Sequence, residues 1–126
     1  MELPKNEKSF LFRHEGELTK RIYEGDFKVK CLLSIGDKRI LEIEKSQLTV
    51  DLTNPTGNLS AIGTVVANLR VRVIDAPDWF KQNIRSLDIL DEEVFFELYS
   101  KCIDAETEWI KSIKSDVKEK ETAEGN

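Results

Sequence analysis

Apolar and polar residues alternate along the first quarter of the chain. Phe27, Val29 and Cys31 alternate with Lys28 and Lys30, so that one face of this run is apolar and the other is charged. Two Glu-Gly pairs, Glu15-Gly16 and Glu24-Gly25, interrupt the alternation, and such pairs favour tight turns. The period of two therefore predicts a three-stranded antiparallel meander. Its strands are expected at residues 9–14, 17–23 and 26–33.

A small sheet with one apolar face needs a cover, and the following segments predict helices. Residues 36–48 fit a helical stripe, and Ser34 and Asp37 have the spacing of a capping box at its start. Leu41 and Ile43, and also Thr49 and Val50, would suit strands as well. We favour the helix over residues 36–48.

A second helix is predicted after Asn58, which suits an N-cap position. Its apolar residues step by three and four along the chain. They are Leu59, Ile62, Val66, Leu69 and Val73. Pro77 ends or redirects this helix because proline lacks an amide donor and disfavours a helical residue before it. Asp75 is then expected to cap a short helical turn over residues 78–82.

A long helix is predicted from residue 91 to about residue 114 or 118. Acidic residues at its start are favoured by the helix dipole. Its apolar stripe is interrupted only by Glu106. The stripe consists of Phe95, Leu98, Tyr99, Cys102, Trp109 and Ile113.

Together these segments predict an α+β fold, in which an N-terminal three-stranded antiparallel meander is packed by three to four C-terminal helices. Residues 1–8 are expected to form a flexible arm and residues 9–114 a single domain. Residues 115–126 are expected to form a charged tail that frays, because they carry little apolar surface.

Composition narrows the class of protein. The 126 residues suit one domain, and 24 acidic against 19 basic residues give a net charge of −5. This balance argues against a nucleic-acid partner, since such proteins usually present a basic face. The polar start does not resemble a signal peptide, and no run approaches the roughly 18 apolar residues of a membrane span. We expect a soluble intracellular protein with no membrane partner.

The sequence predicts no catalytic, cofactor-binding or metal-binding residues. His14 is the only histidine and is interpreted as a partly exposed surface group rather than a catalytic base. Cys31 and Cys102 lack a zinc spacing and are expected as buried thiols, with the Cys102 pKa raised by burial. Four clustered acids are interpreted mainly as helix-start residues rather than a metal site. They are Asp88, Asp91, Glu92 and Glu93.

The aromatic residues suggest contact with a partner. Trp79 and Phe80 are adjacent in a short linker and cannot point the same way, so both could pack in the core or one could anchor a partner. The last helix would be about 36 Å long, against about 20–27 Å for the strands, so its stripe could outrun the sheet. An uncovered stripe suggests a protein partner or self-association. The candidate partner-binding residues are Trp79, Phe80, Phe95, Tyr99 and Trp109.

Three segments carry a likeness to a known family. They are YEGDFKVK at residues 23–30, DAPDWF at residues 75–80 after a helix ending LRVRVI, and DEEV at residues 91–94 followed by Leu98, Tyr99 and Trp109. Their order and spacing resemble the small tail assembly chaperones of long-tailed bacteriophages. The likeness covers roughly residues 9–113.

The resemblance implies a protein that is not an enzyme and needs no cofactor. Such chaperones work in the host cytoplasm, bind the long helical tape measure protein, keep it in solution and leave the assembled tail. A groove formed by the last helix and the Trp79–Phe80 turn would cover the client, and the acidic surface would keep the complex dissolved.

Two alternatives remain open. The chain could be a structural virion component of the tail or the head–tail connector, or a small phage protein that binds a host protein. Each of these classes, like the chaperone, uses a protein partner, and a homo-oligomer is compatible with all three.

Overall fold

The computed structural model describes residues 3–48 and 57–124, with side chains described for residues 3–48 and 59–115. The predicted α+β class is confirmed, with a three-stranded antiparallel sheet and four helices in this part of the chain. The elements in order are β1 (Lys8–Glu15), β2 (Ile22–Val29), α1 (Ile35–Leu48), α2 (Gly57–Arg72), β3 (Val73–Asp75), α3 (Asp78–Ser86) and α4 (Glu93–Glu124).

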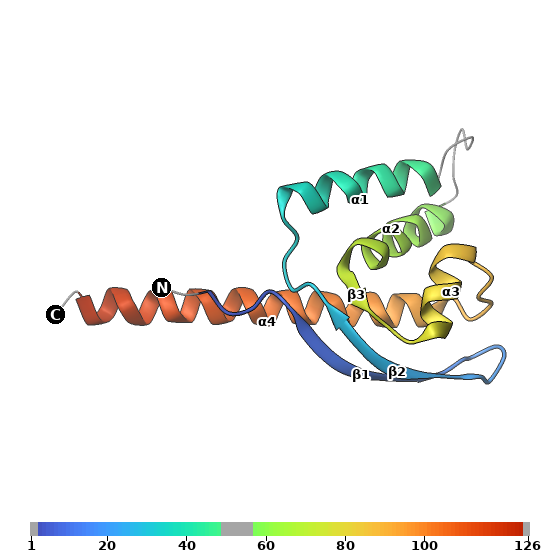
Figure 1. Cartoon of the computed structure of the whole chain (residues 1–126), viewed down its shortest axis with the longest axis horizontal. Coiled ribbons are helices and arrows are strands. Elements are labelled where there is room, and N and C mark those ends of the chain that lie inside the picture. Colours follow the sequence, from blue (N-terminus) through green and yellow to red (C-terminus); the bar gives the residue numbers. More distant parts are fainter. Residues whose placement is uncertain (1–2, 49–56, 125–126) are drawn as a thin grey trace.

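The long helix α4 runs along most of the length of the molecule (Figure 1). The β1–β2 hairpin lies on one side of α4 and α2 lies on the other, while α1 lies outermost, against α2. The far end of α4 projects beyond the rest of the domain. The first described residues run beside this projecting part.

The hairpin follows the predicted alternation in β1. Phe12 lies opposite Gly25, and Phe10 lies opposite Phe27, so the inward face of the pair is mostly aromatic. Leu11 and its neighbours in register point to solvent. The sheet order is β1-β2-β3, which leaves β1 and β3 as the edges.

The predicted turn at Glu24-Gly25 is wrong, because β2 runs straight through this pair. The hairpin instead turns at residues 16–21, where the Gly16 amide donates to the Arg21 carbonyl at 2.7 Å. Gly25 is needed for another reason: a β-carbon there would lie 2.6 Å from the Pro77 ring. Glycine marks a close approach here rather than a turn.

The third strand is also not the one predicted. Residues 26–29 belong to β2, and the third strand is β3, with Lys28 opposite Asp75. The expected capping role of Asp75 is therefore wrong, since Asp75 is extended in β3 and accepts a hydrogen bond from the Ala76 amide. Pro77 takes the N-cap position of α3.

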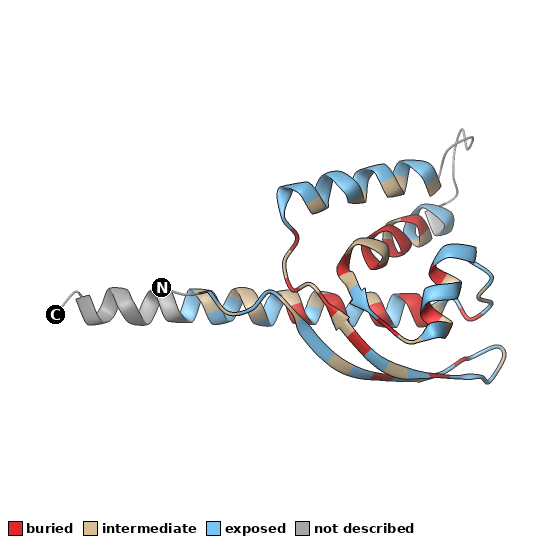
Figure 2. Cartoon of the chain, in the orientation of Figure 1, coloured by how far each residue is buried: buried red, intermediate tan, exposed pale blue. Residues whose placement is uncertain are grey.

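Helix α1 confirms the predicted helix and its capping box. The Ser34 amide donates to the Asp37 carboxylate and the Asp37 amide donates to the Ser34 hydroxyl, each at 3.0 Å. No residue of α1 is fully buried (Figure 2). An ion pair of 2.9 Å between Glu44 and Arg70 joins α1 to α2.

Edge-to-face aromatic contacts form the centre of the core. The Phe27 ring lies 5.7 Å from Phe12, 5.8 Å from Trp79 and 5.2 Å from Phe80. Phe80 in turn contacts Phe95 of α4 at 6.0 Å. Such pairs add about 0.5–1.5 kcal/mol each beyond the burial of their surface. The core therefore ties β2, α3 and α4 together.

Helix α4 confirms the long helix but continues past the predicted end, to Glu124. The interruption of its stripe by Glu106 has a structural reason, because Glu106 pairs with the buried Arg72 of α2 at 3.6 Å. Further along, the Trp109 indole donates to the Pro4 carbonyl at 3.4 Å. The stripe does outrun the sheet, but residues 3–7 cover part of it. Asn6 fastens this segment to the domain through both the amide and the carbonyl of Leu32.

Candidate functional site

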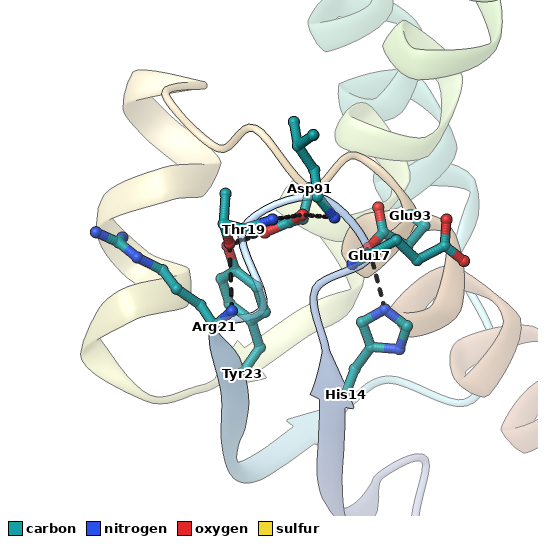
Figure 3. Close-up of polar contacts among 8 residues, drawn as sticks. His14, Glu17, Thr19, Arg21, Tyr23, Asp91 and Glu93 are labelled. Atoms are coloured by element: carbon teal, nitrogen blue, oxygen red, sulfur yellow. Dashed lines mark hydrogen bonds and ion pairs between the residues drawn. The ribbon is translucent and has the colours of Figure 1, made fainter.

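A polar cluster joins the hairpin loop to the segment before α4 (Figure 3). Its centre is Asp91, whose side chain is fully buried. One carboxylate oxygen accepts from the amides of Leu18 and Thr19, at 2.9 and 3.1 Å. The other accepts from the Thr19 hydroxyl and from the Tyr23 hydroxyl, the latter at 2.8 Å. We call Asp91, Leu18, Thr19 and Tyr23 the Asp91 junction.

These contacts keep Asp91 ionised. Burial alone would raise its pKa, but the hydrogen bonds from Thr19, Tyr23 and Leu18 outweigh burial and hold the pKa well below its usual range. The junction also depends on Gly16, since a β-carbon there would overlap the Asp91 carboxylate. A buried, fully engaged carboxylate with a low pKa is an anchor rather than a proton-transfer group.

Glu93 forms a second contact between the loop and α4. Its Oε1 accepts from the Glu17 amide at 2.7 Å and lies 3.3 Å from Nε2 of His14. Burial would raise the Glu93 pKa, but the hydrogen bonds from the backbone and His14 lower it on balance. His14 is half-buried, close to the predicted surface position.

The interpretation of the clustered acids as helix-start residues needs correction for Asp91. Asp91 precedes α4, and its side chain reaches back to the hairpin loop, 72 and 73 residues earlier in the chain, as its hydrogen bonds from the Thr19 and Leu18 amides show. Nothing in the spacing of these acids reveals such a contact. Within residues 3–48 and 57–124, no three His, Cys, Asp or Glu side chains are grouped as a metal ion would need.

Both cysteines are free and buried, which confirms their prediction. Burial raises the pKa of Cys102 to about 12 and also raises that of Cys31. A thiol with such a pKa remains protonated near neutral pH and is a poor nucleophile.

The structure separates the five aromatic residues predicted to bind a partner. Phe80 and Phe95 are 3% and 4% exposed and belong to the core. Trp79 is half-buried, packs on Tyr23, Phe27 and its neighbours, and donates its indole hydrogen to the Glu24 carbonyl at 2.9 Å. Its packing follows the alternative in which Trp79 and Phe80 both serve the core. Trp79 therefore presents only part of its side chain to solvent, and Phe80 presents almost none.

Tyr99 and Trp109 are half-buried on α4, where both pack against the core. Neither is among the large apolar side chains that the described residues leave exposed. Large apolar side chains are exposed elsewhere: on the β1–β2 hairpin, on β3, on α1, and at the end of the domain where α2 and α4 begin.

An apolar cavity of about 230 Å³ lies at that end, between α2, the α3–α4 connection and the first turns of α4. Val65, Val66 and Phe95 form its buried floor. The half-buried Ile62 and Ile89 also line it. Phe95 is the one predicted partner-binding residue that contributes to this cavity.

The rim of the cavity is apolar and open to solvent. Leu59, Leu87 and Phe96 line it and are 39%, 42% and 37% exposed. Sequence reasoning missed the rim, because Leu87 lies in a connection rather than on a helical stripe. A signal was nevertheless present, since three apolar residues, Leu87, Ile89 and Leu90, are clustered in this short connection between two helices.

Leu87 has an unusual backbone conformation. It lies just after α3 with φ of 60°, and its amide donates to the Asn83 carbonyl at 2.8 Å. Glycine is the usual residue at such a left-handed helix end, and a larger residue costs about 1 kcal/mol or more there. The chain therefore keeps a leucine on the cavity rim at a cost in stability.

Charge near the cavity is negative. Glu92 is the one charged residue that lines it, and Asp88 is exposed between the lining residues Leu87 and Ile89. No Lys, Arg or His lines the cavity among the residues with described side chains. The site can accept apolar groups, and its margin favours positive charge.

Among the described residues, none of the helices combines the length and apolar character that crossing a bilayer requires. A comparison of the chain with known protein families, with curated proteins and with solved structures found no match.

Proposed function

We propose that this protein is a non-catalytic tail assembly chaperone of a long-tailed bacteriophage, which binds the tape measure protein in the host cytoplasm. The observation that carries the proposal is the apolar cavity beside α2 and α4, with its half-exposed rim of Leu59, Leu87 and Phe96. The resemblance of the sequence to this family names the client.

The size of the cavity favours a protein partner. Small-molecule sites usually enclose about 300–1,000 Å³ and surround most of their ligand. A cavity of about 230 Å³ with an open rim instead suits one or two apolar side chains from another chain. An amphipathic helix that places its apolar face in such a groove is a common mode of recognition.

Helix α1 adds a second apolar surface. Ile40 and Ile43, three residues apart on this helix and so on neighbouring positions of one face, are 49% and 44% exposed. Ile35 at the start of the helix is 88% exposed. A client with a long apolar stripe would cover more than one such surface. The net charge of −5 would keep the complex in solution.

Co-expression tests the proposal. The protein is expressed with the product of a long, helical reading frame from the same genome, and the soluble fraction is separated by size exclusion. We expect the client to be soluble and to elute with this protein, and to be insoluble when expressed alone. A client that remains insoluble in both cases would contradict the proposal.

Mass spectrometry of purified virions separates a chaperone from a virion component. A chaperone leaves the assembled tail, so its peptides should be absent from particles whose tail-tube peptides are abundant. Peptides present in stoichiometric amounts would assign the chain to the virion instead.

A further inference from the structure

We infer that the cavity at Leu87 and Phe96 is the docking site for a basic amphipathic helix, which inserts an apolar anchor side chain between Lys or Arg residues. This inference rests on the proposed function, because it describes the client segment that the chaperone would recognise. It specifies the site and the chemistry of the segment, which the proposal itself leaves open.

The shape and lining of the cavity suit an inserted side chain. Its floor of Val65, Val66 and Phe95 is rigid core, while its rim is partly open. A pocket built on packed helices and closed by a fixed floor can hold one large aliphatic or aromatic side chain in a single orientation. Such buried anchors usually dominate binding between proteins.

The backbone conformation of Leu87 also indicates a binding role. Its φ of 60° would suit glycine better, yet an apolar side chain 42% exposed is held at this position. Strained residues cluster at binding sites, where the surrounding structure maintains them. Nothing in the packing of the described core requires Leu87, since it is not part of the core cluster. A role in contacting a partner explains both its exposure and its strain.

The charge at the rim of the cavity favours a basic segment. Glu92 lines the cavity and Asp88 lies on the adjoining connection, and both are exposed. Neither side chain has an ion pair among the residues with described side chains, whereas Glu93, next to Glu92, is engaged with the hairpin loop. Positive residues that flank the anchor would therefore find unpaired carboxylates at the rim.

The test uses two synthetic helical peptides of about 18 residues, a length that supports helix formation. Both carry leucine at positions i, i+3, i+4 and i+7, and the remaining positions are lysine in one peptide and glutamate in the other. Binding to the full-length protein is measured by fluorescence anisotropy. We expect the Leu/Lys peptide to bind at least about tenfold more tightly than the Leu/Glu peptide.

Matched variants locate the site. Leu87→Gly removes the rim side chain and relieves the strained backbone. Lys20→Gly makes the same relief in the β1–β2 loop, at the other non-glycine residue with positive φ among the residues that the structure describes. We expect Leu87→Gly to bind the Leu/Lys peptide at least about tenfold more weakly than the wild type does, and Lys20→Gly to bind it as tightly as the wild type. Phe96→Ala is the second rim variant and should behave as Leu87→Gly does. Equal binding by all four proteins would overturn the inference.

A second pair of variants tests the charge of the rim. Glu92→Gln should lower the affinity for the Leu/Lys peptide by about threefold or more, since one carboxylate of the rim is lost. Glu97→Gln, an exposed position of α4 outside the cavity lining, should not. An equal loss in both would indicate general attraction to an acidic protein and would overturn the assignment of the rim.

Light scattering tests whether a second copy of this protein fills the cavity instead. A wild-type dimer that Leu87→Gly converts to a monomer would show that a second copy fills the cavity, which would overturn the inference of a basic helix. Failure of the inference is distinct from failure of the proposed function. If the wild type solubilises its client and Leu87→Gly and Phe96→Ala do so equally well, the chaperone function stands and the docking site is wrong.

Discussion

Two regions of opposite character lie close together in the sequence: the buried polar contacts of Asp91 and the exposed apolar rim at Leu87. At the Asp91 junction every carboxylate oxygen is engaged, the side chain is fully buried, and two distant segments are fastened together. At the cavity four residues earlier, apolar side chains stand half-exposed, and one of them has a strained backbone.

The difference separates residues that hold the fold from residues that are available to a partner. A satisfied buried polar group contributes to a unique structure, because any change leaves donors without acceptors. An exposed apolar rim contributes little to the isolated chain and gains its value only when another surface covers it. Stability should therefore be sensitive at the junction, and binding at the cavity.

The largest expected effect is that of Asp91→Asn. The amide would offer donors to the amides and hydroxyls that now donate to the carboxylate, so we expect the free energy of unfolding to fall by about 2–4 kcal/mol. Urea denaturation followed by circular dichroism measures the change. The matched control is Asp88→Asn, which is exposed and should change stability by less than about 0.5 kcal/mol. Equal losses of stability in the two variants would contradict the role of the Asp91 junction in holding the fold.

Gly16→Ala should have the next largest effect. Its methyl group would overlap the Asp91 carboxylate, and we expect a loss of about 1–3 kcal/mol in the free energy of unfolding. Gly36→Ala is the control: its β-carbon would lie 3.7 Å from the Ser34 hydroxyl, an ordinary contact, within helix α1. There alanine should stabilise by about 0.5–1 kcal/mol. A gain in stability for Gly16→Ala would show that the loop does not need its close approach to Asp91.

Acid should weaken the wild type more steeply than the Asp91→Asn variant. The pKa of Asp91 is lowered in the folded protein, so the folded state binds this proton less readily than the unfolded chain, whose Asp pKa is about 3.9. The resulting stabilisation is present above about pH 4–5 and is lost as the pH falls below this range. Denaturation at a series of pH values between neutral and acidic measures the slope. Parallel curves for the two proteins would contradict the role of the charge.

The smallest expected effect concerns α1, the helix with no fully buried residue. Glu44→Gln removes its 2.9 Å ion pair with Arg70 and should lower the opening free energy of α1 amides by about 0.5–1 kcal/mol in hydrogen exchange. Amides of α4 between Val94 and Ala105 should be unaffected. The control Glu42→Gln alters a longer, more exposed pair with Lys45 and should change exchange less. Slower exchange in α1 than in α4 would contradict the placement of the stable core.

Much of the fold could be predicted because local signals and packing agree. The capping box at Ser34 and Asp37, the stepped apolar residues of α2 and the long stripe of α4 each act within a few turns of one helix. The alternation of β1 likewise follows from one buried face. Such patterns are visible in a single sequence, because burial of one face produces the period directly.

The remaining features depend on contacts between distant segments. Gly25 resembles a turn residue, but glycine is required there by the close approach of Pro77, which follows β3 and lies far from Gly25 in the sequence. β3 is three residues long and forms only because β2 offers it an edge. Asp91 has the spacing of a helix-start acid, and only the folded hairpin turns it into a buried acceptor.

The candidate site was the least predictable part. Two of the aromatic residues predicted to bind a partner, Phe80 and Phe95, are used to fill the core. The rim instead takes Leu87 from a connection and Phe96 from the solvent side of α4, and neither belongs to the predicted stripe. Amphipathic patterns identify what one chain buries, and they carry less information on what it leaves for a partner.

Leu87→Gly tests the separation of fold and binding most directly, because the two readouts should move apart in one protein. The variant is co-expressed with the client, and its urea midpoint is measured on the isolated chain. We predict an unfolding midpoint at or above that of the wild type, because glycine relieves the backbone at this position, together with a marked loss of soluble client. A variant that retains the client in full, or one that loses the client only because it unfolds, would contradict the assignment of the cavity as the binding site.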